Sequence, residues 1–149
     1  MIIQEEDRLK EVLGESIKIK ILATDISEKA LRSAAVGEYP RSTVSVIQPY
    51  YIQKYFTAES GKYRITDELK EVISFRLFNL MNPFPFSNKF DIIFCRNVMI
   101  YFDAETQEKI VDKFYNFLNP GGLLFIGHSE SLSYREHRFK YIQPTVYMK

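Results

Sequence analysis

Two hydrogen-bonding side chains follow an apolar run in the middle of the chain. The stretch FDIIFCRNVMIYFD, residues 90–103, places Arg96 and Asn97 at the end of a segment that is typical of a strand buried on both faces. In open parallel sheets, ligands bind at the carboxyl ends of the strands. We therefore predict that Arg96 and Asn97, with the aromatic Tyr101 close behind, belong to a binding site.

Two more predicted strands end on residues of the same kind. The run IKIKILATDIS, residues 17–27, reaches Asp25, and the run ISFRLFNLM, residues 73–81, reaches Asn79 and Leu80. Parallel strands would bring these ends to one edge of a sheet, where a ligand can meet a carboxylate and an amide. The simpler interpretations are an Asx turn or a helix-start charge for Asp25, and a turn residue for Asn79.

Several other chemistries are excluded. Cys95 is the single cysteine, so neither an intramolecular disulfide nor a Cys-rich metal site is possible, and we interpret it as a small buried strand residue. His128 has no acid or nucleophile at a spacing that would make a catalytic triad, and we interpret it as structural. His137 is expected at the surface. No metal site is predicted.

Charge and hydropathy exclude further classes. The 149 residues carry 20 Lys and Arg against 19 Asp and Glu, a formal charge of +1, which argues against nucleic-acid binding. The segment NPFPF, residues 82–86, is similar to a motif of amino-methylating DNA enzymes, but Phe84 separates its prolines. No run approaches the roughly 18 apolar residues of a membrane span, and the first residues lack the apolar core of a signal peptide. We predict a cytoplasmic protein without membrane insertion.

Helical and strand patterns alternate along the chain, which favours a doubly wound α/β fold. The less periodic region after Pro40 predicts a short helix and a hairpin around a Ser-Gly turn. We expect helices over residues 3–13, 27–37 and 103–118, the last one stopped by Pro-Gly-Gly, and strands at residues 17–25, 73–78, 90–95, 123–127 and 139–149.

Five segments resemble one protein family across nearly the whole chain. TDIS, FNLM, FCRNVMIYFD, LNPGGLLFIGHSES and PTVYMK closely resemble the catalytic domain of the chemotaxis receptor methyltransferases, the CheR family. The resemblance implies a Rossmann-like class I S-adenosylmethionine-dependent methyltransferase fold, with residues 1–149 as a partial catalytic domain and about 40–73 as an inserted β-subdomain. Members of that family transfer a methyl group to glutamate side chains on the cytoplasmic helices of chemoreceptors.

The resemblance assigns four residues to the cofactor, S-adenosylmethionine, and to its product S-adenosylhomocysteine. Asp25 is expected to bind the two ribose hydroxyls. Asn79 and Leu80 match the pair that holds the adenine, through amide hydrogen bonds and an apolar face. Asn97 is expected near the amino-acid portion of the cofactor.

Two residues are assigned to catalysis in the same way. Arg96 and Tyr101 are expected near the acceptor carboxylate and the transferring methyl group. A glutamate acceptor is already ionised at neutral pH, so the reaction needs alignment and no general base, and the fork of an arginine suits that task. The alternatives are a salt bridge from Arg96 to Asp25 or Asp103, and a core position for Tyr101.

The resemblance also predicts an absence. The family's first strand and its Gly-containing cofactor loop have no counterpart in this sequence, so we expect two parallel strands with unpaired edges, self-association through them, and an active site that another segment must complete. The alternatives to an enzyme are a non-catalytic receptor-binding or regulatory module and a truncation product of a longer methyltransferase.

The length of the predicted hairpin indicates how the chain would bind a chemoreceptor. Family members that dock on a receptor's C-terminal peptide carry a longer Gly-containing loop there, whereas TAESGKYRIT has Gly61 alone. We therefore expect binding to chemoreceptor helices without that peptide tether. The alternative is a hairpin that only covers an edge of the sheet.

Overall fold

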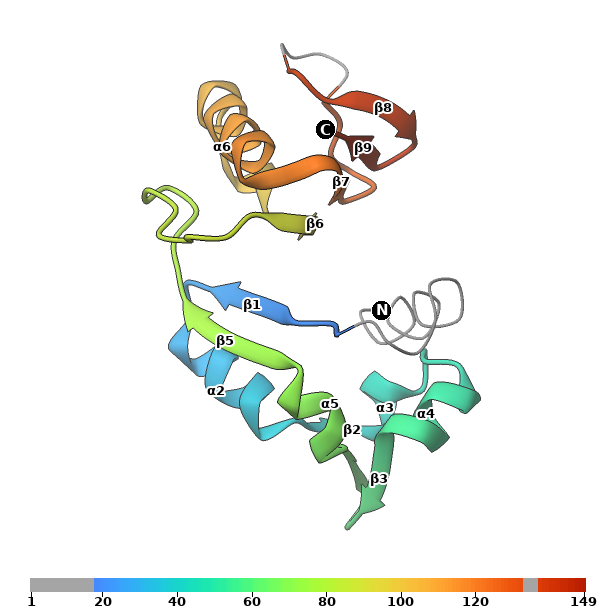
Figure 1. Cartoon of the computed structure of the whole chain (residues 1–149). Helices are drawn as coiled ribbons and strands as arrows, with labels where there is room; N and C mark the ends of the chain where they lie inside the picture. Colours follow the sequence, from blue (N-terminus) through green and yellow to red (C-terminus); the bar gives the residue numbers. More distant parts are fainter. Residues whose placement is uncertain (1–17, 133–136) are drawn as a thin grey trace. The chain divides into compact units, whose positions relative to one another are not determined.

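A computed structural model describes residues 18–132 and 137–149, so the helix predicted over residues 3–13 lies outside the described residues. The chain divides into two compact units, Met1–Asn79 and Leu80–Lys149 (Figure 1). None of the helices in the described ranges is long and apolar enough to cross a membrane.

The first unit contains a two-stranded parallel sheet. Strand β1 (Ile21–Asp25) pairs with β5 (Ile73–Leu77), and helix α2 (Glu28–Val36) follows β1. The side chain of Ser27 accepts a hydrogen bond from the Ala30 N–H, and Gly37 ends the helix in the left-handed region at φ 70°. Both helix signals in the sequence are therefore confirmed.

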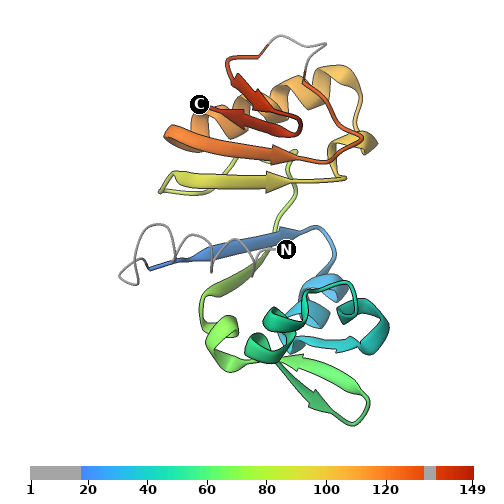
Figure 2. The same cartoon turned by 90° about the vertical axis from the view of Figure 1, so that its right-hand side faces the viewer.

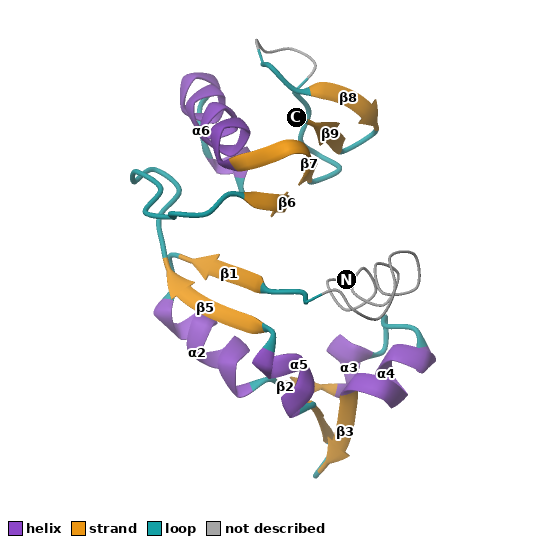
Figure 3. Ribbon diagram, in the orientation of Figure 1, coloured by secondary structure: helices purple, strands orange, loops and turns teal. Residues whose placement is uncertain are grey.

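An antiparallel sheet with short helices is inserted between α2 and β5 (Figure 3). The predicted hairpin is confirmed, because β3 and β4 pair across Ser60 and Gly61, which both have positive φ. Helix α5 was not predicted separately from the strand that follows it. The strands are β2 (Glu38–Pro40), β3 (Phe56–Glu59) and β4 (Lys62–Ile65) in the order β2-β4-β3, and the helices are α3 (Arg41–Val44), α4 (Pro49–Tyr55) and α5 (Asp67–Glu71).

The second unit is a mixed four-stranded sheet with one long helix (Figure 2). The pair β6–β7 is parallel, and the pairs β7–β9 and β8–β9 are antiparallel. The strand order is β6-β7-β9-β8. The elements are β6 (Phe90–Cys95), the 3-10 helix η1 (Met99–Tyr101), α6 (Ala104–Phe117), β7 (Leu118–Ile126), β8 (Lys140–Gln143) and β9 (Val146–Met148).

Helix α6 begins as the sequence predicted. The Asp103 side chain accepts a hydrogen bond of 2.8 Å from the Thr106 N–H. The backbone and side-chain hydrogen bonds from Thr106 lower the pKa of the Asp103 carboxyl below its usual value. The charged form of Asp103 is therefore the form that stabilises the helix.

The predicted end of this helix is confirmed to within one residue, but its predicted stop signal, Pro-Gly-Gly, is wrong. The helix stops at Phe117, and Pro-Gly-Gly, residues 120–122, lies inside β7. Lys149 Nζ donates to the carbonyl oxygens of Tyr115 at 2.6 Å and Leu118 at 2.8 Å, which supplies partners for groups at the helix end. This contact comes from the far end of the chain, so a local reading of the turn residues missed it.

One apolar core joins α6 to its sheet. Phe114 on the helix and Leu124 on β7 are almost fully buried, and Phe84 from the NPFPF segment packs against the same core. Residues of this segment are therefore packing residues. The buried members are Cys95, Met99, Ile110, Val111, Phe114, Leu118, Leu124, Ile126, Leu132, Phe139 and Tyr147.

Open edges remain on β1, β5 and β6. Within the described residues, β1 and β5 pair only with each other, and β6 pairs only with β7. Each strand therefore presents backbone N–H and C=O groups along one side that no strand of its own sheet satisfies.

Candidate functional site

The carboxyl end of β6 carries the Arg-Asn pair that the sequence singled out. Arg96 follows the last strand residue and is partly buried, whereas Asn97 is exposed. Asn97 has a φ of 59°, which is in the left-handed region. A residue other than glycine held there costs about 1–3 kcal/mol, so the surrounding contacts must stabilise this backbone.

The stabilising group is the carboxylate of Glu130. Its exposed fraction is 9%, and it accepts four hydrogen bonds from backbone N–H groups. Oε1 accepts from Val98 at 3.0 Å and from Met99 at 2.8 Å, and Oε2 accepts from Asn97 at 3.1 Å and from Gly127 at 2.5 Å. A hydrogen bond to a charged group contributes about 1.5–3 kcal/mol, so this set offsets the strain at Asn97.

Gly127 leaves the space that this carboxylate occupies. A Cβ at this position would lie 2.6 Å from Asn97 Oδ1 and 2.7 Å from Glu130 Oε2. The Glu130 N–H also donates to the Gly127 carbonyl at 3.0 Å, which closes a tight turn after β7. Any larger residue at 127 would push the ends of β6 and β7 out of this arrangement.

The thiol of Cys95 lies under the same strand end. It is buried at 5% exposure, and desolvation together with the nearby charge of Glu130 raises its pKa to about 12. The thiolate is therefore scarce at neutral pH, and Cys95 is a poor nucleophile. The interpretation of Cys95 as a small buried strand residue is confirmed.

Helix η1 presents Tyr101 to solvent. The Tyr101 side chain is 80% exposed, so its alternative interpretation as a core aromatic is wrong. Met99, two residues earlier, is instead the buried member of η1. The N–H of Met99, the first residue of η1, donates to Glu130 Oε1. Tyr101 therefore extends from a turn that this carboxylate holds in place.

The two histidines differ from expectation in opposite ways. His128, interpreted as structural, is exposed after β7. His137, expected at the surface, is half-buried and packs edge-on against Tyr147 with ring centroids 5.8 Å apart. Neither side chain is part of a catalytic constellation that the sequence or the structure supports.

At the carboxyl end of β1, Asp25 lies beside the end of β5. Asp25 is in register with Leu77, and the Phe78 N–H donates to the Asp25 carbonyl at 2.9 Å, one residue before Asn79. Asp25 Oδ1 accepts from the Ser27 N–H at 2.8 Å, so the Asx-turn interpretation is confirmed. Both Asp25 and Asn79 are exposed, which leaves them accessible to a ligand.

Leu80 opens the second unit and packs against its core. The side chain is partly buried, and its carbonyl accepts a hydrogen bond of 3.1 Å from Lys113 Nζ. The same ammonium reaches the carbonyls of Met81 at 3.0 Å and Asn82 at 3.2 Å. The backbone after Leu80 is therefore fixed to helix α6.

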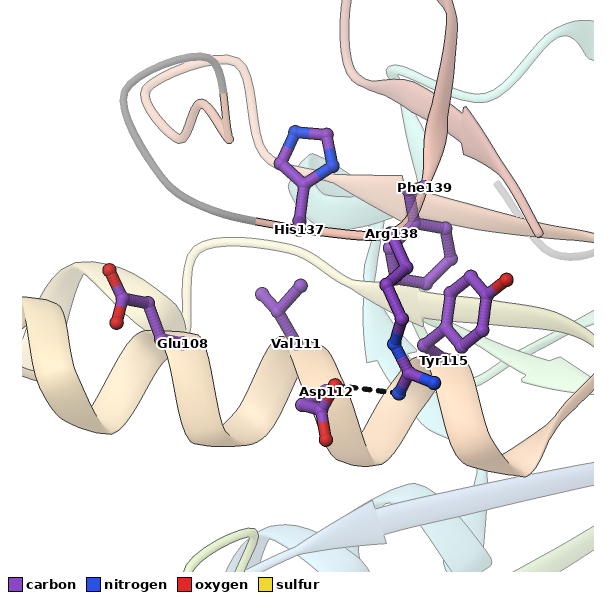
Figure 4. A pocket seen from close by; sticks show the side chains of 7 residues that line it. All are labelled: Glu108, Val111, Asp112, Tyr115, His137, Arg138 and Phe139. Carbon is purple, nitrogen blue, oxygen red and sulfur yellow. Dashed lines mark hydrogen bonds and ion pairs between the residues drawn. The ribbon is translucent and has the colours of Figure 1, made fainter.

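Two of the hollows in the second unit lie along α6, and neither is lined by a predicted site residue. One cavity of about 20 Å³ lies where Arg138 crosses α6 and pairs with Asp112 at 2.6 Å (Figure 4). It suits a water molecule and not a cofactor. The other is an open hollow of about 550 Å³ along α6 near Met81. Within the described ranges, no group of His, Cys, Asp or Glu is arranged to hold a metal ion.

Sequence reasoning missed Glu130, the residue that organises the β6 end. His128 and Ser129 in GHSES drew attention as strand-end residues, whereas the acid beside them did not. Its role depends on donors that lie 31 to 33 residues earlier in the chain. The signal that was available is an acid just beyond a buried strand that is parallel to β6.

The comparisons with known proteins agree with one another on the family. A model described as CheR methyltransferase, SAM binding domain, matches residues 7–148. The chemotaxis protein methyltransferase of Borreliella burgdorferi is 42% identical over 136 residues, which is 90% of this chain and 48% of that protein. The protein of the same name from Escherichia coli K12 is 40% identical over 133 residues, 86% of this chain and 46% of that one.

The chain therefore spans about half the length of the curated relatives that it matches. Among solved structures, PKMT2 from Rickettsia typhi covers 72% of this chain and 16% of its own, at 20% identity and a TM-score of 0.46. The family assignment rests on the sequence matches.

Proposed function

Because the chain belongs to the CheR methyltransferase family, matching its S-adenosylmethionine-binding domain, we propose that it acts in the methylation of glutamate side chains on chemoreceptors. The acceptors are the cytoplasmic helices of those receptors, as the resemblance implies. The two-residue turn at Ser60 and Gly61 supports binding without a C-terminal peptide tether. The cytoplasm is the compartment in which this reaction would take place.

The chemistry of the exposed strand-end residues fits S-adenosylmethionine. The carboxylate of Asp25 suits the ribose hydroxyls, and it keeps Oδ2 for this purpose while Oδ1 serves the turn at Ser27. The amide of Asn79 suits the adenine, with Leu80 beside it as an apolar contact. Asn97 suits the charged amino-acid end of the cofactor.

The remaining residues align the acceptor. When bound, S-adenosylmethionine would supply an electrophilic methyl group on a positively charged sulfur; a carboxylate oxygen would take the methyl group and the C–S electron pair would return to sulfur. Arg96 orients the acceptor glutamate through a forked pair of hydrogen bonds, and Tyr101 lies against the same group. No residue has to remove a proton, because the acceptor carboxylate is ionised at neutral pH.

The observation that carries this proposal is the anchored Arg96–Asn97 turn at the carboxyl end of β6. Four hydrogen bonds to one buried carboxylate hold this turn, and its side chains follow a parallel strand, which is where α/β proteins bind ligands.

The open edges of β1 and β6 favour a second candidate, a non-catalytic receptor-binding or regulatory module. A parallel strand added at such an edge would satisfy its backbone groups, and a second copy of the chain is one source of that strand. We expect sedimentation to show association that grows with protein concentration. A stable monomer at high concentration would contradict this expectation.

Calorimetric titration with S-adenosylhomocysteine tests the proposed function. We expect binding in the micromolar range, about 8 kcal/mol. Asp25→Asn should weaken binding by about tenfold because the ribose loses a charged acceptor. Glu59→Gln, an exposed carboxylate on β3, is the matched control and should bind like the unmodified chain. No heat at about millimolar ligand would reject cofactor binding by this chain and favour the regulatory module.

A further inference from the structure

Glu130 is a buried carboxylate that the reaction itself does not use. Its oxygens accept only backbone N–H groups in the described part of the chain, from the turn after β6 and from Gly127 after β7. The carboxylate therefore joins the carboxyl ends of two parallel strands, at the edge where a ligand would bind.

We propose that Glu130 is a positioning residue that holds the Arg96–Asn97 turn in its ligand-binding conformation. This inference rests on the proposed function and identifies what sets the geometry of that site. Oε2 accepts from the N–H of Asn97, and Oε1 accepts from the next two N–H groups, so three successive residues are fixed by one group. The left-handed φ of 59° at Asn97 is the conformation that these bonds select.

Two features of the residues around Glu130 indicate that its carboxylate positions the turn and is not simply a buried charge. Gly127 lies against both partners at once, since a Cβ added there would come within 3 Å of Glu130 Oε2 and of Asn97 Oδ1 and N. Asn97 itself remains exposed although its N–H is tied down. The carboxylate thus fixes the backbone and leaves the Asn97 side chain available for a ligand.

Replacing Glu130 by glutamine changes the hydrogen-bonding groups at the end of the side chain without changing the size of the side chain. In Glu130→Gln one oxygen still accepts, but the NH₂ group faces N–H donors and cannot accept from them. We expect the chain to fold while the turn loses its single conformation. Glu105→Gln is the matched control, because Glu105 is an exposed carboxylate on α6 that pairs with Lys109.

The first measurement is a ¹H–¹⁵N spectrum of the full ¹⁵N-labelled chain. In the unmodified chain, the amide protons of residues 97, 98, 99 and 127 should lie at low field, and the coupling between the amide and Cα protons of Asn97 should report a positive φ. Glu130→Gln should move these four resonances and accelerate their hydrogen exchange by about tenfold or more, whereas Glu105→Gln should leave them in place.

The second measurement is affinity for S-adenosylhomocysteine, which should fall by about tenfold in Glu130→Gln and stay unchanged in Glu105→Gln. Unchanged amide resonances, or changed resonances with unchanged affinity, would overturn the positioning role. If the unmodified chain binds no ligand, the proposed function fails, and the Asn97 coupling in the unmodified and Glu130→Gln chains still decides whether Glu130 sets this turn. Should Glu130→Gln not fold, Glu130→Asp replaces it, because it keeps the charge and withdraws the carboxylate by one carbon.

Discussion

The carboxyl ends of β1 and β6 both carry polar side chains, but the contacts that hold these two strand ends differ. At β6, the turn with Arg96 and Asn97 rests on a buried carboxylate and on a core in which Phe114 is 2% exposed. At β1, Asp25 is exposed, its side chain bonds to the neighbouring Ser27, and α2 has no fully buried residue. Both ends pair with a distant strand, but side-chain hydrogen bonds from a distant residue hold only the β6 turn, whereas the Asp25 side chain bonds to a residue two positions away.

This contrast indicates that the two strand ends differ in how firmly each is held. The β6 end is preorganised, so its polar groups lose little conformational freedom when a ligand binds. The β1 end lacks such support among the described residues, and ligand binding or an added strand at its open edge would provide it. Substitutions near the β1 end and near the β6 end measure how much each end is stabilised by its surroundings.

The largest effect is expected from core truncation. Phe114→Ala should lower the free energy of unfolding by about 3–5 kcal/mol, because it empties the centre of the core under α6. Leu31→Ala on α2 should cost about 1 kcal/mol, since that side chain is only partly buried. Urea unfolding measures both values. Equal losses would show that the β1 side is as well supported as the β6 side.

A smaller effect is expected from two glycine substitutions that act by different means. Gly127→Ala should cost about 2–3 kcal/mol and move the Asn97 amide resonance, because the new methyl group meets Asn97 and Glu130. Gly61→Ala should cost about 1 kcal/mol through its positive φ alone, because the space around it is open. A loss at Gly127 no larger than the loss at Gly61 would count against a tightly built β6–β7 end.

The smallest effect is expected from the pH dependence of the two helix caps. The hydrogen bonds from Thr106 lower the pKa of the Asp103 carboxyl, so its stabilising contribution is present above the pKa of the unfolded chain and is lost as the pH falls through the folded pKa. The uncharged cap of α2, Ser27, does not titrate in this range.

Asp103→Ser keeps a cap and removes this titration. The unmodified chain should be the more stable of the two at about pH 6, and the difference should shrink as the pH falls to about 2. Thermal melting of both chains across this range measures the difference. A difference that is independent of pH would show that the charge of Asp103 contributes nothing to α6.

Local signals in the sequence predicted much of this fold. The caps at Ser27 and Asp103, the glycine at 37, and the hairpin turn at Ser60 and Gly61 each depend on residues within a few positions, and the structure has them all. The strands at β1, β5 and β6 followed from apolar runs in the same way.

Long-range contacts account for what the sequence did not predict. The hydrogen bonds from Lys149 to the end of α6 join residues more than 30 positions apart, and the turn at Asn97 depends on Glu130 at a similar distance. Nothing in the composition of GHSES distinguishes an acid that accepts four backbone N–H groups from one at the surface. The roles assigned to Asp25, Asn79, Leu80 and Asn97 in cofactor binding, and to Arg96 and Tyr101 in catalysis, stay predictions.

The central claim, that strand-end residues of this chain bind S-adenosylmethionine, is tested most directly by following ¹H–¹⁵N resonances during titration with S-adenosylhomocysteine. We expect the amides of Asp25 and Asn97 both to shift, with one common midpoint in the micromolar range, about 8 kcal/mol. Both resonances unmoved at about millimolar ligand, or a shift at only one of the two strand ends, would contradict it.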